Sequence, residues 1–182
     1  MFEKLNNILK PKFFKMETVH MLLRGVLPDT AILSLIDSGF IQNANPATVQ
    51  PASLDIQLDL NHVYEVKRFY LPREGEKITS ILTSLNAKPV CSGVIEQHKR
   101  YIIKAIESFN GLPFYMRMSP KSSPGRLFTL SRLLTDGYNA YDEAYPSEHT
   151  RTNWISVIPS FNLGLSETEP VSQMRFLKKV RF

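Results

Sequence analysis

The amino-acid sequence predicts a mainly β protein with short flanking helices, folded as a β-sandwich or a closed, distorted β-barrel. Beyond Ala87 the chain consists of short β-rich runs separated by clusters of Gly, Pro, Asn and Asp, which is typical of such folds rather than of a parallel sheet. Before Ala87, two segments have the apolar spacing of short helices. The 182 residues suffice for one domain with a buried core.

The two helices are predicted at residues 28–39 and 75–87. The first segment, PDTAILSLIDSG, has Pro28 and Asp29 near its start and Gly39 as its end signal. The second segment carries apolar residues at i, i+3, i+4 and i+7, the spacing of one helix face. The apolar faces consist of Ile32, Leu33, Leu35 and Ile36 in the first helix, and of Ile78, Ile81, Leu82 and Leu85 in the second.

The strands are predicted from alternation and from β-rich composition. Residues 49–58, VQPASLDIQL, alternate apolar and polar side chains after Pro51, and residues 62–69 do so less strictly. Both segments are predicted to be strands. The β-rich runs beyond Ala87 are residues 93–97, 101–109, 112–118, 126–134, 153–161 and 171–180.

Charge and composition exclude several classes of protein. The net charge of +5 lies largely near the two ends, at residues 4–15 and 175–181, and forms no basic stripe interleaved with aromatic residues, so nucleic-acid binding is not expected. No apolar run reaches the roughly 18 residues of a membrane span, and no secretory signal is evident. We therefore expect a cytoplasmic protein without a membrane partner.

The single cysteine and the N-terminal segment set two further expectations. Cys91 is the only cysteine, which excludes an internal disulfide and any multi-cysteine zinc site. Residues 1–20 mix lysines with loosely spaced apolar residues around Pro11 and are predicted to be a basic, flexible extension. Residues 21–182 are predicted to form the folded domain.

The segment SPKSSPGRLFTLSR, residues 119–132, concentrates hydrogen-bond donors on a predicted tight turn that leads into a strand. Lys121 and Arg126 offer charge-assisted bonds to an anion, and Ser122 and Ser123 add hydroxyls. This composition favours a phosphate-binding turn. The same residues are also good turn formers, and an exposed connection is the alternative that the composition leaves open.

Four segments and the first predicted helix together resemble the dCTP deaminase family, in particular the N-terminal half of the longer bacterial enzymes. They are VQPASLDIQL, SPKSSPGRLFTLSRLLTD, YDEAYP and PVSQMRF, in this order, after the opening helix GVLPDTAILSLIDSG. The resemblance runs from about residue 25 to 182. It implies the dUTPase-like superfamily fold, a distorted β-barrel or β-clip, with active sites between the subunits of a homotrimer or higher homo-oligomer.

The resemblance also implies a substrate and site residues. The substrate would be dCTP, with Mg²⁺ carried on its triphosphate, and the products dUTP and ammonia. The triphosphate would contact Lys121, Ser122 and Ser123. Ser122 and Arg126 would also be catalytic residues, and Arg126 would lie near the cytosine. Asp142 matches the aspartate that binds the deoxyribose hydroxyl, and Gln173 a glutamine near the phosphates.

Three acidic or amide residues have alternative interpretations from their local sequence. Asp142 lies among turn formers and has the pattern of a solvated turn carboxylate. Gln173 fits an outward-facing strand residue. Asp55, directly after QPASL, fits a structural hydrogen-bonding residue at a strand start better than a catalytic acid.

The sequence departs from the family at the catalytic base. Hydrolytic deamination needs a group that takes a proton from the attacking water and passes one to the departing amine, and in this family that group is a glutamate. Anchoring the comparison on Pro159 puts Ser156 at its position, and residues 153–161 contain no carboxylate. Glu148 is a substitute only if its loop folds back into the site. No metal site of the protein itself is predicted, because His149 shows no ligand spacing with another histidine.

Three functions follow from the resemblance and its departures. The first is an active dCTP deaminase with Glu148 or another group as base. The second is a catalytically degenerate homologue that keeps nucleotide binding or serves as an interaction protein. The third, a dUTPase-like pyrophosphatase, ranks last because the aromatic- and glycine-rich closing tail of such enzymes is not seen. The chain stops at Phe182, where relatives continue into a closing tail or a second half, so weaker nucleotide affinity is expected.

Overall fold

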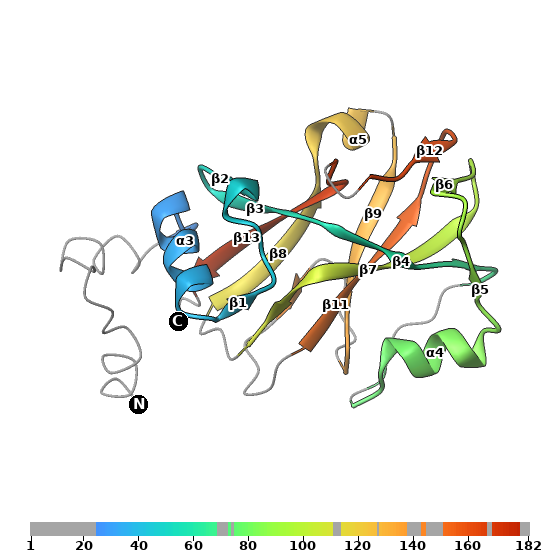
Figure 1. Cartoon of the computed structure of the whole chain (residues 1–182), viewed down its shortest axis with the longest axis horizontal. Helices are drawn as coiled ribbons and strands as arrows, with labels where there is room; N and C mark the ends of the chain where they lie inside the picture. Colours follow the sequence, from blue (N-terminus) through green and yellow to red (C-terminus); the bar gives the residue numbers. More distant parts are fainter. Residues whose placement is uncertain are drawn as a thin grey trace.

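Two antiparallel β-sheets lie face to face and enclose the main hydrophobic core (Figure 1). The computed structural model describes residues 25–68, 73, 75–110, 114–126, 128–137, 143–144, 151–166 and 169–178. The larger sheet contains β5 (Lys88–Pro89), β4 (Leu58–Val66), β7 (Arg100–Phe109), β11 (Arg151–Ile158) and β9 (Leu130–Thr135) in this order, and β1 (Ile41–Gln42) pairs with β7. The smaller sheet contains β10 (Glu143–Ala144), β8 (Phe114–Pro120), β13 (Ser172–Lys178), β3 (Ser53–Ile56) and β2 (Val49–Gln50).

The remaining elements are short. A third, two-stranded sheet pairs β6 (Val94–Ile95) with β12 (Leu163–Gly164), and a 3-10 turn, η1 (Pro46–Thr48), precedes β2. The helices are α3 (Asp29–Asp37), α4 (Ile78–Ser84) and α5 (Ser122–Arg126). The predicted mainly β fold with short flanking helices is confirmed.

The core receives one face of each sheet and one face of α3. In α3 the buried residues are Ala31, Ile32 and Leu35, as the apolar spacing predicts. Gly39 ends the segment with a φ of 75°, a left-handed conformation that glycine adopts without a steric penalty. From the sheets the core takes Leu54, Ile56, Met116, Met118, Met174 and Phe176 on one side, and Leu58, Ile103, Ala105, Leu133, Ile155 and Val157 on the other.

Helix α4 covers the outer face of the larger sheet. Its buried residues Ile78, Ile81 and Leu82 pack with side chains of that sheet, among them Trp154 and Ile102. Asp136 Oδ1 accepts a hydrogen bond of 2.8 Å from the backbone N–H of Ile78 and so satisfies a donor at the helix start. The second predicted helix is therefore confirmed, and together with the core on the inner side it leaves the central strands of the larger sheet buried on both faces.

The prediction of one strand over residues 49–58 and another over 62–69 is wrong in its boundaries. The first segment turns at Pro51 and Ala52, and β3 and β4 are separated only at Gln57, where the chain passes from one sheet to the other. The Glu107 carboxylate accepts the Gln57 backbone N–H at 3.0 and 3.1 Å. This side chain, 50 residues away, satisfies the donor that the sheet change leaves unpaired.

The predicted strand over residues 126–134 begins later than expected. Residues Ser122–Arg126 form the single-turn helix α5, and β9 starts at Leu130. The Gly125 N–H bonds to the Lys121 carbonyl at 2.9 Å, and the Thr129 N–H bonds to the Pro124 carbonyl at 3.0 Å. Pro124 fits a first helical turn because its missing N–H has no helical partner there.

Backbone contacts on both sides hold Phe128 in a strained conformation. Its φ is 54°, a region that bulky residues rarely occupy. Its N–H bonds to the Gly125 carbonyl at 3.1 Å, and its carbonyl accepts the Ser160 hydroxyl at 2.8 Å. The ring is 81% exposed, so it contributes little burial against this strain.

We expect the substitution Phe128→Gly to stabilise the protein by about 0.5–1 kcal/mol, because the relief of about 1–3 kcal/mol of backbone strain exceeds the roughly 0.4–1 kcal/mol that glycine costs through the more flexible unfolded chain. Urea denaturation monitored by Trp154 fluorescence measures the effect. Phe161→Gly is the matched control: Phe161 is 55% exposed and its φ is not positive, so glycine there should be neutral or destabilising. A loss of stability in Phe128→Gly would contradict the strain.

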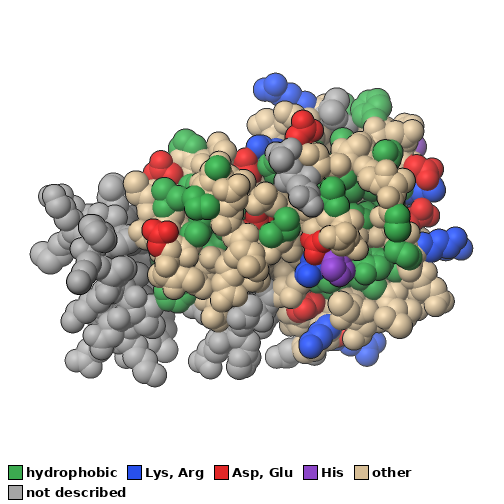
Figure 2. All heavy atoms as spheres, viewed as in Figure 1, with side chains coloured by type: hydrophobic (Ala, Val, Ile, Leu, Met, Phe, Trp, Pro, Cys, Tyr) green, Lys and Arg blue, Asp and Glu red, His purple; other side chains and the backbone are tan. Residues whose placement is uncertain are grey.

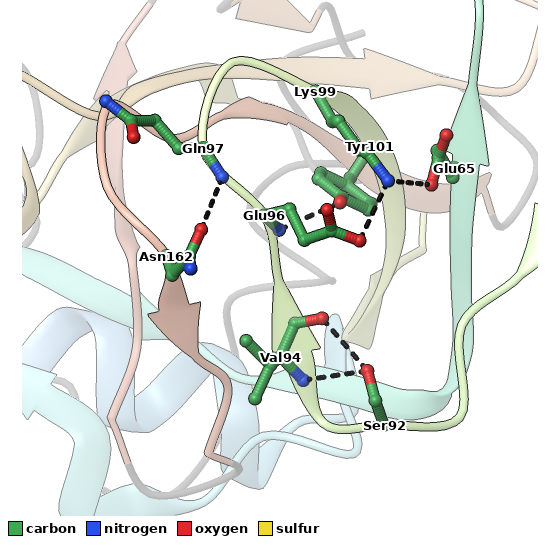
Figure 3. A network of polar contacts seen from close by, with 8 residues as sticks. All are labelled: Glu65, Ser92, Val94, Glu96, Gln97, Lys99, Tyr101 and Asn162. Carbon is green, nitrogen blue, oxygen red and sulfur yellow. Dashed lines mark hydrogen bonds and ion pairs between the residues drawn. The ribbon is translucent and has the colours of Figure 1, made fainter.

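A network of polar contacts ties β6 and the β11–β12 connection to the larger sheet (Figure 3). The Lys99 ammonium lies 3.3 Å from Glu65 and 2.8 Å from Glu96. The Tyr101 hydroxyl accepts the Glu96 N–H at 2.8 Å, and Asn162 Oδ1 accepts the N–H of the residue that follows, Gln97, at 2.9 Å. These contacts fix the connection whose Ser160 holds Phe128 beside α5.

Candidate functional site

The predicted phosphate-binding segment connects the two sheets at one end of the molecule. It follows β8, passes through α5 and enters β9 (Figure 1). Ser122, Ser123 and Arg126 are exposed on α5, while Lys121 is half-buried immediately before it. The structure therefore brings the four predicted residues onto one surface turn, with their polar groups accessible.

Lys121 is held by an aspartate from a different strand. Its Nζ lies 2.6 Å from Asp55 Oδ2, with the Lys121 side chain 33% exposed and the Asp55 side chain 5% exposed. Gln50 Nε2 donates to the same oxygen at 3.2 Å. The backbone N–H of Lys121 also bonds to the Val171 carbonyl at 3.0 Å. Both ends of this residue are thus fixed.

A polar row crosses the outer face of the smaller sheet beside this ion pair. Gln173 is the register partner of Asp55 on one side and of Ser119 on the other. Its Oε1 accepts the Ser53 hydroxyl at 3.1 Å. The neighbouring Met174 faces the core, so Gln173 faces outward, as predicted for a strand residue of this position. Asp55 Oδ1 and Ser119 Oγ are buried and have no hydrogen-bond partner among the described residues.

Ser156 lies on a different face of the molecule. Its neighbour Val157 belongs to the core between the sheets, so Ser156 points to the outer face of the larger sheet, where α4 packs. It is 3% exposed and is the register partner of Ile102 and Arg132. Ile158, two residues further along β11 and therefore on the same face, is apolar and half-buried. Within one chain, Ser156 and the polar row of the smaller sheet therefore face opposite outer surfaces, with the core between them.

Two predicted site residues, Asp142 and Glu148, lie outside the described residues, as do residues 1–20. The neighbouring Glu143 belongs to β10, which pairs with β8 through Glu143 and Arg117. The sugar-binding turn of the prediction is therefore adjacent in sequence to an edge strand of the smaller sheet, the sheet that carries the polar row.

Asp55 is the residue whose place in the site the local sequence alone did not reveal. Its position after QPASL predicted a structural hydrogen bond, and it makes one, with Lys121 of the predicted phosphate-binding segment. The pairing joins residues 66 positions apart. The sequence signal for this contact was that the segments VQPASLDIQL and SPKSSPGRLFTLSRLLTD, which carry Asp55 and Lys121, occur together in the family pattern.

The part of the chain that the structure describes contains no group of three or more His, Cys, Asp or Glu side chains placed to hold a metal ion. None of its helices is long and apolar enough to cross a membrane. On the face drawn in Figure 2, Lys and Arg side chains are scattered among acidic and uncharged ones.

Comparisons with known proteins agree with this arrangement. Residues 23–180 match the family described as 2'-deoxycytidine 5'-triphosphate deaminase (DCD) N-terminal domain. The chain belongs to this dCTP deaminase family. The predicted resemblance is thereby confirmed, and the match covers α3, both sheets and the Lys121 turn.

A solved structure supports the same assignment. The crystal structure of 2'-deoxycytidine 5'-triphosphate deaminase from Agrobacterium tumefaciens is similar with a TM-score of 0.75 and 28% sequence identity, over 84% of this chain and 46% of that one. The dCTP deaminase domain described here thus spans about half the length of that relative. A search of curated proteins finds no match.

Proposed function

We propose that this chain binds dCTP in a site built around the Lys121 turn, and that its deamination of dCTP to dUTP and ammonia is severely impaired. The observation that carries the proposal is the Lys121 ammonium, fixed 2.6 Å from Asp55 beside two exposed hydroxyls and Arg126. Ammonium, hydroxyl and guanidinium groups on one turn are the donors that phosphate oxygens accept.

The residues would have distinct roles in binding. Lys121, Ser122 and Ser123 would contact the triphosphate, Arg126 would lie near the cytosine, and Gln173 near the phosphates. Asp142 would accept a hydrogen bond from the deoxyribose hydroxyl. Mg²⁺ would be carried by the phosphate oxygens of the nucleotide, an arrangement that this ion favours. The protein would not need to supply a set of metal ligands. The ion would neutralise charge on the triphosphate.

The site would be completed by a second copy of the chain, in a homotrimer or a higher homo-oligomer. The support is that Ser156 and the polar row face opposite outer surfaces of one chain. Because the packed core of the two sheets lies between these surfaces, a nucleotide bound on the polar row would meet a Ser156 side chain from a neighbouring copy. A neighbouring copy would bring its Ser156 surface against the Lys121 turn.

The pyrophosphatase alternative differs from deamination in its substrate and products. A dUTPase-like enzyme would use the same turn to hold dUTP and would release pyrophosphate. No observation on the described residues favours it over dCTP binding, and assaying dUTP with pyrophosphate detection separates the two.

Isothermal titration calorimetry with dCTP and Mg²⁺ tests the proposal. We expect saturable binding that Lys121→Ala weakens on the order of 10–100-fold, because a charge-assisted hydrogen bond is worth about 1.5–3 kcal/mol. Lys104→Ala is the matched control, since Lys104 pairs with Asp59 at 3.5 Å on the outer face of the larger sheet. No binding, or an equal loss in both variants, would reject the Lys121 turn as the nucleotide site.

A further inference from the structure

The ion pair between Asp55 and Lys121 differs in its burial from every other ion pair among the described residues. The Asp55 side chain is 5% exposed, whereas the acidic partners of the other pairs are 20–59% exposed. Its distance, 2.6 Å, is also the shortest. A buried carboxylate is costly unless a cation and further donors stabilise it, so this pair is a fixed feature rather than a transient surface contact.

The surroundings of Asp55 leave it little freedom to move. It lies in β3, between β2 and β13 in the sheet, and its Oδ2 accepts from Gln50 Nε2 as well as from Lys121. Its register partner Gln173 is held in turn by the Ser53 hydroxyl. The oxygen that receives the lysine is therefore placed by backbone pairing and not by a flexible loop.

The geometry leaves the lysine able to bind an anion. An ammonium group has three N–H donors; Asp55 takes one of them, and the side chain remains 33% exposed. A free lysine side chain loses considerable rotamer freedom when it binds a ligand. Because Asp55 already restricts that freedom before an anion arrives, the ordering cost at binding is reduced.

We propose that Asp55 is a positioning residue, which holds Lys121 in the orientation that receives the triphosphate. This inference rests on the proposed function of the Lys121 turn. It predicts that the Asp55 charge strengthens anion binding through Lys121, although a carboxylate near a phosphate would by itself repel it. The sign of the effect therefore separates positioning from plain electrostatics.

A double-mutant cycle on the full chain tests the proposal, with inorganic tripolyphosphate as the probe and calorimetry as the readout. Asp55→Asn keeps the size of the side chain and removes its charge. We expect it to weaken tripolyphosphate binding about 5–10-fold in the wild-type background and less than 2-fold in the Lys121→Ala background. Asp55→Glu should recover part of the loss. Asp59→Asn removes the same charge from another lysine pair and should change nothing.

Each outcome decides the inference. Tighter binding by Asp55→Asn, equal losses in both backgrounds, or no tripolyphosphate binding by the wild-type chain would overturn it. If tripolyphosphate binds with the expected coupling but dCTP does not bind, the proposed function fails and the positioning role stands. If Asp55→Asn does not fold, Gln50→Ala is measured instead. A loss of tripolyphosphate affinity of 2-fold or more in the wild-type background, but not in the Lys121→Ala background, supports positioning. An unchanged affinity overturns it.

Discussion

Purified protein incubated with dCTP and Mg²⁺ should bind the nucleotide and yet release ammonia no faster than about 10⁻²–10⁻⁴ of the rate of a family member that carries the glutamate. This is the contribution that a general acid–base group typically makes. The segment from Asn153 to Phe161, which includes most of β11, contains no carboxylate, and the Ser156 hydroxyl cannot perform the two proton transfers at neutral pH. Coupled detection of ammonia, with chromatography of dUTP, measures the rate.

Restoring a carboxylate on β11 should recover turnover where the fold tolerates it. Ser156 is 3% exposed and lies beside Ile102, so Ser156→Glu places a charge in an apolar environment and should cost several kcal/mol of stability. Ile158 faces the same surface and is half-buried. Ile158→Glu should therefore fold better, and turnover by either folded variant would identify the missing base.

The opposite result would revise the assignment of the base. If the unmodified chain deaminates dCTP at an ordinary rate, Glu148 becomes the candidate base, and Glu148→Gln should then abolish ammonia release. If the unmodified chain and both carboxylate variants bind dCTP without turnover, the defect lies in the reaction geometry rather than in one side chain.

The elements that the sequence predicted well are those defined by local periodicity. Ile32 in α3 and Ile81 in α4 lie where the helical spacing placed them. The strands β1, β5, β10 and β12 have two residues each and carry no period of their own, because only pairing with a distant strand defines them. The break at Gln57 depends on Glu107 in the same way.

In the candidate site, too, the features that local sequence determines could be predicted and those that depend on tertiary packing could not. The donors of the Lys121 turn are contiguous in sequence, so their chemistry and their exposure could be predicted together. The Asp55 contact and the opposite facing of Ser156 depend on how two sheets stack, which no local pattern specifies. The outward direction of Gln173 was one of the interpretations that its imperfect alternation left open, and its bond to Ser53 had no local signal.

Raising the pH from 5 to 8 should lower the free energy of unfolding by about 2–3 kcal/mol through a single buried side chain, Glu107. This residue lies on β7, is 1% exposed and alternates with Ala105 and Phe109 toward the core. Burial raises its pKa from the ordinary 4.5 to about 7, against the opposing effect of the hydrogen bond from the Gln57 N–H. A buried carboxyl is favoured in its neutral form.

The sign of the effect follows from proton binding. Because the folded-state pKa exceeds the unfolded one, the folded state binds more protons between these values, and stability falls with rising pH there. The stabilisation is fully present below pH 4.5 and is lost as the pH rises through about 7. The variant Glu107→Gln keeps an oxygen for the Gln57 N–H and cannot ionise, so it should lack this loss.

Urea denaturation of both proteins at pH 5 and pH 8 measures the difference. The two should have similar stability at pH 5, and Glu107→Gln should be the more stable by about 2–3 kcal/mol at pH 8. Glu96→Gln is the control, because Glu96 is 59% exposed and its loss should leave the pH profile parallel to that of the wild type. A parallel profile for Glu107→Gln as well would mean that Glu107 is ionised in the folded protein at pH 5. The Gln57 junction would then hold a buried charge.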